Sequence, residues 1–164
     1  MQNYLMNKDK FSYEPTWMEI IPAQVMEELK LFFTNHVAAL NKKLSFPESV
    51  PLFTFKSDLS LLMRVLCNMV TNALEATDEN GIVKVWTEQT GKTLSFCVWN
   101  DKEIKDEIKL RIFQRNFSTK EEAGRGIGTY SMKLFGETIL GGKVSFITSG
   151  YKGTTFMFSL VSKE

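Results

Sequence analysis

The chain has 164 residues, and its 20 lysines and arginines against 19 aspartates and glutamates give a formal net charge of +1. This balance argues against a protein held to nucleic acid or to an anionic membrane by bulk charge. The content of 43% hydrophobic and 24% charged residues is ordinary for one folded domain. No apolar run reaches the ~18 residues of a membrane helix. The polar start MQNYLMNKDK is unlike a signal peptide, so we expect a cytoplasmic location.

The cysteine and histidine content excludes several kinds of site. Cys67 and Cys97 are far apart in sequence, so they fit neither a disulfide framework nor a zinc site with paired ligands. We expect both to be small buried apolar residues. His36 is the single histidine, which removes most metal sites and Ser-His-Asp arrangements, and we expect it at the surface or core edge of a helix.

Hydrophobic periodicity and turn residues predict the first half of the fold. Pro22 is favoured at the first position of a helix, and Asp58 can cap a second helix through its side chain. In chain order, we expect an extended segment at 17–21, an amphipathic helix of about 20 residues at 22–40, short strands at 44–46 and 52–55, and a long helix at 59–77.

The second half alternates hairpins with one more helix. The dipeptides Asn80-Gly81 and Gly141-Gly142 mark a turn and a helix end. We expect strands at 82–89 and 93–100, a loop and short helix at 101–111, a helix at 129–140, and a closing hairpin of strands 143–149 and 154–161. This order predicts a two-layer α/β sandwich of the α+β type, with a mixed, largely antiparallel sheet covered on one face by about three helices. Residues 1–14 would be an arm or the end of an upstream linker, and 15–164 one domain.

Two asparagines on the long predicted helix suggest a metal site. Asn68 and Asn72 are four residues apart, so their amides point the same way. An amide oxygen is a neutral hard ligand that suits magnesium. A polar surface stripe is the alternative, but this helix is otherwise very apolar, and polar groups on it are costly unless they are used.

A glycine cluster and the loop before it suggest phosphate binding. Glycines in the stretch 124–128 allow the backbone to approach an anion closely, and the helix that follows presents free N–H groups. The stretch matches neither the Walker A loop nor the dinucleotide fingerprint, and a tight turn is the alternative. Upstream, Phe113 and Phe117 can anchor a polar loop in which Lys120 could reach a phosphate or simply be solvated.

Together, these features resemble the catalytic ATP-binding domain of sensor histidine kinases, in the GHKL superfamily shared with gyrase B and MutL. The resemblance covers residues 15–161 and depends on the combined order of its motifs. They are the N box (68–76), the F box (112–120), the G2 box (124–130) and the last hairpin (153–156).

The resemblance implies that magnesium and ATP bind between the asparagine helix and a mobile lid. By resemblance, Asn72 ligates magnesium, and Asn68 lies close to the metal and phosphates. The resemblance implies a catalytic role for Asn68, Asn72 and Lys120. The implied nucleotide-binding set adds Thr119 and Lys120 in the lid, Gly124, Arg125, Gly126, Ile127, Gly128 and Thr129 around the phosphates, and Thr154 beside adenine. Gyrase-like relatives carry a general-base glutamate where this chain has Asn68, and an amide cannot take a proton. This favours phosphoryl transfer to a histidine over transfer to water.

One motif departs from the family. The G1 box is normally Asp-x-Gly-x-Gly, and its aspartate receives the adenine amino group. The matching stretch 98–104 has no glycine, and Asn100 followed by Asp101 stands where the aspartate is expected. A charged acceptor bonds about twice as strongly as a neutral one. We therefore expect weakened or rearranged adenine recognition.

The phosphoacceptor also has no match in this chain. His36 lies inside the resembling domain and is followed by Val37, not by the usual acidic residue. The implied partners are thus a histidine-bearing dimerisation domain, in the same full-length chain or in trans, and a response regulator downstream. We expect no nucleic acid and no direct membrane contact, even as the cytoplasmic part of a membrane-bound sensor. Two alternatives stay open: a silent or nucleotide-dependent docking module, and a stand-alone serine kinase of the anti-sigma type.

Overall fold

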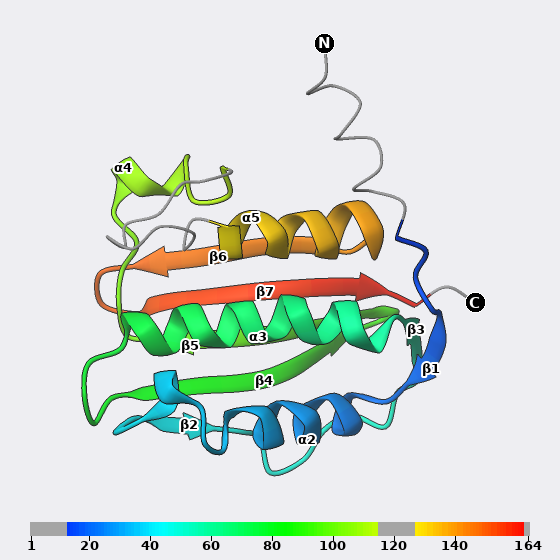
Figure 1. The fold of residues 1–164 in the computed structure, drawn as a ribbon. Coiled ribbons are helices and arrows are strands. Elements are labelled where there is room, and N and C mark those ends of the chain that lie inside the picture. The colour runs from blue at the N-terminus through cyan, green and yellow to red at the C-terminus, as the bar shows by residue number, and fades with distance from the viewer. Residues whose placement is uncertain (1–12, 115–126, 163–164) are drawn as a thin grey trace.

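The computed structural model describes residues 13–114 and 127–162, which form a layer of helices on one face of a five-stranded sheet (Figure 1). The helices are α2 (Pro22–Phe33), α3 (Leu59–Ala76), α4 (Asp106–Lys109) and α5 (Ile127–Lys133), with a 3-10 turn η1 (Val37–Ala39) and a π-helical segment η2 (Leu134–Ile139). The strands are β1 (Met18–Ile20), β2 (Lys43–Ser45), β3 (Phe55–Ser57), β4 (Ile82–Thr90), β5 (Thr93–Asn100), β6 (Lys143–Ser149) and β7 (Gly153–Val161).

The large sheet has the strand order β2-β4-β5-β7-β6. Its pairings are antiparallel, apart from the parallel pair of β2 with β4. The strands β1 and β3 form a separate antiparallel pair. The expected two-layer sandwich with a mixed, largely antiparallel sheet is thus confirmed, and α2, α3 and α5 lie on the same side of that sheet (Figure 1). Of the described helices, none is long and apolar enough to cross a membrane.

Helix α3 supplies the centre of the core. It begins at the expected cap, where Asp58 Oδ1 accepts a hydrogen bond from the Leu61 N–H at 2.9 Å. Its sheet-facing side chains are almost completely removed from water, and each large aliphatic one stabilises the fold by about 1.5–3 kcal/mol. The expected set Leu62, Leu66, Met69, Val70 and Ala73 is buried throughout.

The first helix is shorter than its sequence pattern predicts. α2 ends at Phe33 because His36 Nδ1 accepts a hydrogen bond from the Ala38 N–H at 3.1 Å and starts the 3-10 turn η1. The apolar residues Val37 and Leu40, which continue the helical period, are 80% and 67% exposed. The expectation of one helix over 22–40 is therefore wrong in length.

The strand expected at 52–55 is also displaced. β3 begins at Phe55 because its register is set by β1, with Ile20 opposite Phe55 and Met18 opposite Ser57. Leu52, inside the expected strand, is fully exposed.

The helix expected at 129–140 begins at Ile127 instead, and its second half is π-helical. That half includes Gly136, where an added Cβ would lie 2.9 Å from the ring of Phe158. The glycine thus allows this segment to pack closely on β7.

The two cysteines behave differently from one another. Cys97 is fully buried as expected, whereas Cys67 is only partly buried. Burial raises the pKa of Cys67 to about 11 and that of Cys97 to about 12. The thiolate is the reactive form, so neither side chain is activated as a nucleophile.

Candidate functional site

An open groove of about 900 Å³ runs along the outer face of α3, with walls from α2 and α5. This volume is in the range of ligand sites. One part of the lining is apolar, and the other is rich in amide, hydroxyl and carboxylate groups. The lining residues are Glu28, Leu31 and Phe32 from α2, Met63, Arg64, Cys67, Asn68, Thr71, Asn72 and Glu75 from α3, and Gly128, Ser131 and Phe135 from α5 and η2.

The polar part of this groove brings together three of the residues predicted for metal and phosphate. Asn68 Nδ2 donates a hydrogen bond to the Gly128 carbonyl oxygen at 3.4 Å. Gly128 is also so close to Asn72 that an added Cβ would lie 4.0 Å from the Asn72 Oδ1. Thus Asn68 and Gly128, 60 residues apart in the sequence, lie side by side in the groove.

The donor set at this place fits magnesium. Asn68, Asn72 and Glu75 all line the groove, and they offer amide and carboxylate oxygens, which are hard ligands. Among the described residues there is no cluster of three or more His, Cys, Asp or Glu side chains that could hold a metal ion. Magnesium usually keeps several waters and takes phosphate oxygens as ligands, so one or two protein oxygens suffice.

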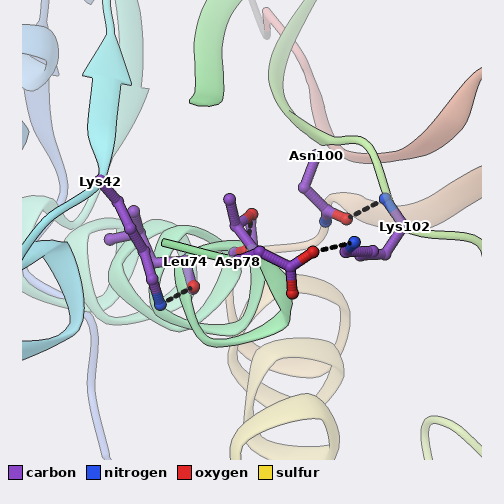
Figure 2. Close-up of polar contacts among 7 residues, drawn as sticks. Lys42, Leu74, Asp78, Asn100 and Lys102 are labelled. Carbon is purple, nitrogen blue, oxygen red and sulfur yellow. Dashed lines mark hydrogen bonds and ion pairs between the residues drawn. The ribbon is translucent and has the colours of Figure 1, made fainter. Parts of the chain in front are cut away.

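Asn100 ends β5 with its side chain almost completely buried, at 5% exposed. Its Oδ1 accepts a hydrogen bond from the Lys102 N–H at 2.9 Å (Figure 2). A backbone N–H can only donate, so the amide atom that faces it is the carbonyl oxygen, and the NH₂ group takes the other direction. The side chain thus fixes the turn after β5, with its NH₂ group directed away from the Lys102 N–H.

Thr154 lies opposite Asn100 in the register of β5 and β7 and is 1% exposed. Its hydroxyl donates to the Lys102 carbonyl oxygen at 2.6 Å. The Thr148 hydroxyl lies 2.7 Å from Thr154 Oγ1 and accepts from the Ile104 N–H at 2.9 Å. Because the Thr154 proton is already donated, Thr148 is the donor between the two hydroxyls. This relay ties the segment after β5 to the closing hairpin.

Two lysines hold the C-terminal end of α3, as Figure 2 shows. Lys42 Nζ donates to the Leu74 carbonyl oxygen at 2.6 Å, and Lys102 Nζ pairs with Asp78 Oδ2 at 2.5 Å. Cations near a helix C-terminus are favourable because they complement its carbonyl groups. The hydrogen bond with Asp78 raises the pKa of Lys102 above its usual value. The Lys102–Asp78 pair therefore links the turn after β5 to α3.

The structure describes some of the other predicted site residues but not all of them. Asp101 is exposed beside the turn, and Thr129 lies partly buried in α5. The predicted loop anchor Phe113 packs on Phe146 and Phe156, with ring centroids 5.9 and 6.3 Å apart. The predicted residues that lie outside the described ones are Phe117, Thr119, Lys120, Gly124, Arg125, Gly126 and the side chain of Ile127.

Sequence reasoning missed four residues around these positions. Lys102, Thr148 and Asp78 organise the turn after β5, and Glu75 lines the groove one helical turn after Thr71. The position of Lys102 could have been found, because an asparagine two residues before a backbone N–H commonly closes an Asx turn. The spacing of Glu75 from Asn68 and Asn72 also places it on the same helix face.

Residues 57–164 match the family model described as histidine kinase-, DNA gyrase B- and HSP90-like ATPase. A probable C4-dicarboxylate sensor kinase of Halalkalibacterium halodurans is 32% identical over 108 residues, 63% of this chain. The heme sensor protein HssS of Staphylococcus aureus is 26% identical over 125 residues, 75% of this chain. The matched parts span only 20% and 27% of the lengths of these two relatives.

Solved structures of histidine kinases share the fold. The nucleotide-free catalytic domain of histidine kinase ThkA superimposes with a TM-score of 0.76 at 28% identity, covering 90% of this chain and 96% of that domain. Full-length ShkA in complex with AMPPNP gives a TM-score of 0.78 at 19% identity, covering 93% of this chain and 33% of ShkA. ThkA in complex with the response regulator TrrA gives a TM-score of 0.74 at 23% identity, covering 99% of this chain and 47% of the matched chain.

Proposed function

Because the chain belongs to the family of histidine kinase-, DNA gyrase B- and HSP90-like ATPases, we propose that it transfers the γ-phosphoryl group of magnesium-bound ATP to a histidine outside this chain. The observation that carries the proposal is the meeting of Asn68, Asn72 and Gly128 at one groove. Its similarity to sensor kinases and to the ThkA catalytic domain supports the histidine kinase branch of the family.

The proposed roles at the phosphate end follow from charge and geometry. Phosphoryl transfer needs mainly positioning and charge neutralisation. The Asn72 amide oxygen would hold magnesium, which supplies positive charge beside the phosphates, and Asn68 would orient the phosphate oxygens. Backbone N–H groups at Gly124, Gly126 and Gly128 would bind the phosphates. The remaining members of the proposed set around the phosphates are Thr119, Lys120, Arg125, Ile127 and Thr129.

The proposed acceptor is a histidine of a dimerisation domain, in the same full-length chain or in trans. A ring-nitrogen lone pair forms the bond to the γ-phosphorus while the bond to the bridging oxygen breaks, and ADP leaves with that electron pair. The amide of Asn68 cannot accept a proton from water, which disfavours hydrolysis. His36 already accepts a hydrogen bond as the cap of η1, which supports an acceptor elsewhere. A response regulator would then receive the phosphate, as the ThkA–TrrA complex suggests.

At the other end of the nucleotide, Asn100, Asp101 and Thr154 would surround the base. Because Asn100 Oδ1 is held by the Lys102 N–H, its NH₂ group is the part left to meet the base edge. An NH₂ group suits the amino group of adenine less well than a carboxylate does. This supports the expectation of weakened or rearranged adenine recognition.

The deciding experiment mixes this chain and ATP with a separately purified histidine-kinase dimerisation domain. We expect acid-labile phosphate on that domain when magnesium is present, and none after EDTA or when the acceptor histidine is replaced by alanine. Absence of transfer, together with absence of any ATP-dependent thermal shift, would instead support the docking module. Acid-stable phosphate on a serine of an added anti-sigma-factor antagonist would support the serine kinase.

A further inference from the structure

The five-stranded sheet has a second face, which none of the described helices covers (Figure 1). Side chains alternate along each strand, so β4 directs Val83 and Val85 into the core and Lys84, Trp86 and Glu88 to the opposite side. This second face lies across the sheet from α3 and the candidate nucleotide groove. Its chemistry is thus independent of the proposed kinase site.

Large apolar groups gather on this open face. The sheet register places Trp86, Cys97 and Met157 opposite one another on three neighbouring strands, and we call such a set of opposed residues a row. The adjoining row joins Trp99 with Ile147, through Thr155. Both tryptophans and Met157 remain partly exposed, and Ile147 is 67% exposed. Tryptophan and methionine are enriched at protein interfaces, so a patch of this composition is typical of a docking surface.

Both indole rings on this face are held in place by charged neighbours. The Lys84 Nζ lies over the Trp99 ring, 4.9 Å from its centroid. The Trp86 Nε1–H donates to Glu88 Oε1 at 2.8 Å. Side chains that are already ordered lose little conformational entropy when a partner binds. The patch is therefore organised for binding before any partner arrives.

The charges on this face complement a second copy of the same face. Along the register, Lys84 lies one row before Trp86 and Glu88 lies one row after it, while Lys143 ends the Glu88 row on β6. A twofold axis along the Trp86 row would place Lys84 over Glu88 of the second copy. A twofold axis along the strands would place Glu88 over Lys143 of the second copy. Either symmetric arrangement pairs opposite charges around an apolar centre.

We propose that this open face binds the same face of a second copy, forming a face-to-face homodimer. Such an interface is isologous, and two sheets packed in this way lie about 10 Å apart. Four strands at about 4.8 Å spacing and five residues at about 3.4 Å rise give a footprint of only ~19 by ~17 Å. This is smaller than a standard stable interface, so we expect a transient dimer with a micromolar or weaker dissociation constant.

The test is sedimentation equilibrium of this chain from low micromolar to near-millimolar concentration. We expect the mean mass to rise with concentration from 18.8 kDa toward twice that value. Glu88→Lys should weaken association at least tenfold, since it places like charges together twice in the dimer. Glu88→Gln, which keeps an acceptor for Trp86, should weaken it less. A second reversal, Lys84→Glu or Lys143→Glu, should restore association and identify the axis.

The matched control is Glu19→Lys, the same charge change at an exposed position of the β1–β3 pair. It should associate like the unchanged chain. The proposal is overturned if the chain stays monomeric throughout, or if Glu88→Lys associates as strongly as the unchanged chain. Equal weakening by Glu19→Lys would overturn it as well, because the contact would then lie elsewhere. Circular dichroism checks that every variant keeps the fold.

Discussion

The two ends of the candidate nucleotide site differ in how far the protein itself already uses their polar atoms. At the base end, Asn100 and Thr154 are almost fully buried and bonded to the backbone of Lys102. At the phosphate end, Asn68 Nδ2 donates a long 3.4 Å hydrogen bond to the Gly128 carbonyl oxygen. The base end departs from the family motif, whereas the phosphate end keeps it. We therefore expect base-end residues to act mainly on stability and phosphate-end residues mainly on binding.

The largest difference between the two ends of the site should come from Asn72→Ala at the phosphate end. We expect at least a 100-fold loss of ATP affinity in the presence of magnesium, about 3 kcal/mol, because the proposed metal ligand is removed. The free energy of unfolding should change by less than about 0.5 kcal/mol. Calorimetric titration with and without magnesium measures the first quantity, and urea unfolding the second. Thr71→Ala in the same groove is the control, and an affinity for Asn72→Ala within threefold of the unchanged chain would disprove the metal assignment.

Gly153→Ala tests the base end of the candidate nucleotide site. Gly153 has φ +74°, and an added Cβ would collide with the backbone of Asn100. Gly91 has φ +58° but open space around it, so Gly91→Ala carries only the left-handed strain of about 1 kcal/mol. We expect Gly153→Ala to lower the free energy of unfolding by about 2 kcal/mol more than Gly91→Ala does. Equal losses in urea titrations would show that the close approach of β7 to Asn100 is unimportant.

Thr154→Val should cost about 1.5 kcal/mol of stability. The change leaves the Lys102 carbonyl oxygen without its donor and breaks the hydroxyl relay with Thr148. Thr155→Val, on the open face of the same strand, is the matched control and should change stability by less than about 0.5 kcal/mol. Thermal unfolding of both variants measures the difference. If the two variants unfold alike, the relay contributes nothing to the fold.

Asn100→Asp should improve the base end as a binding site. One carboxylate oxygen can still accept the Lys102 N–H, while the other becomes a charged acceptor for the adenine amino group. We expect ATP affinity and the preference for ATP over GTP each to rise about fivefold, which is ~1 kcal/mol. Asp101→Asn, one residue along, should have a smaller effect. If competition binding shows an unchanged nucleotide preference, the base binds away from Asn100.

The smallest expected effect is a pH dependence at the start of α3. Burial alone would raise the pKa of Asp58, but the hydrogen bonds from the Leu61 N–H, the Thr16 N–H and the Tyr13 hydroxyl together lower it. The stabilisation is therefore fully present above the ordinary aspartate pKa of about 4 and is lost as the pH falls through the lowered folded-state pKa. Urea unfolding between pH 6 and 3 should show a shallower decline for Asp58→Asn. An identical decline in the free energy of unfolding would show that Asp58 does not cause the pH dependence.

Elements with strong local signals could be predicted from the sequence. Asp58 caps α3 as expected, and the alternation at 82–89 and 93–100, joined by a tight turn, predicted the two strands that pair as β4 and β5. The end of α2 could not be predicted, because Val37 and Leu40 continue the apolar period although both lie exposed after the turn made by His36. Nor could the parallel pairing of β2 with β4 be predicted, since the three-residue strand β2 carries no signal for its distant neighbour.

The candidate site shows the same division. The spacing of Asn68 and Asn72 on one helix predicted their shared direction, and both line the groove beside Gly128. The role of Lys102 was missed because it depends on three contacts from different segments, with Asn100, Asp78 and Thr154. Such contacts exist only once β5, β7 and the end of α3 are assembled. Family motifs do not indicate them, because this chain replaces the G1 glycines here.

The neighbouring strands β5 and β7 are separated by about fifty residues of chain, which leave the sheet at Asn100, rejoin it as the edge strand β6 at Lys143 and reach β7 at Gly153. Closing a flexible loop costs entropy that grows only logarithmically with length, about 0.6 kcal/mol for each doubling. Lengthening or shortening the part between Asn100 and Lys143 therefore costs little as long as β5, β7 and β6 stay paired. The sheet frame and the segment that would enclose the nucleotide can thus change at different rates during evolution.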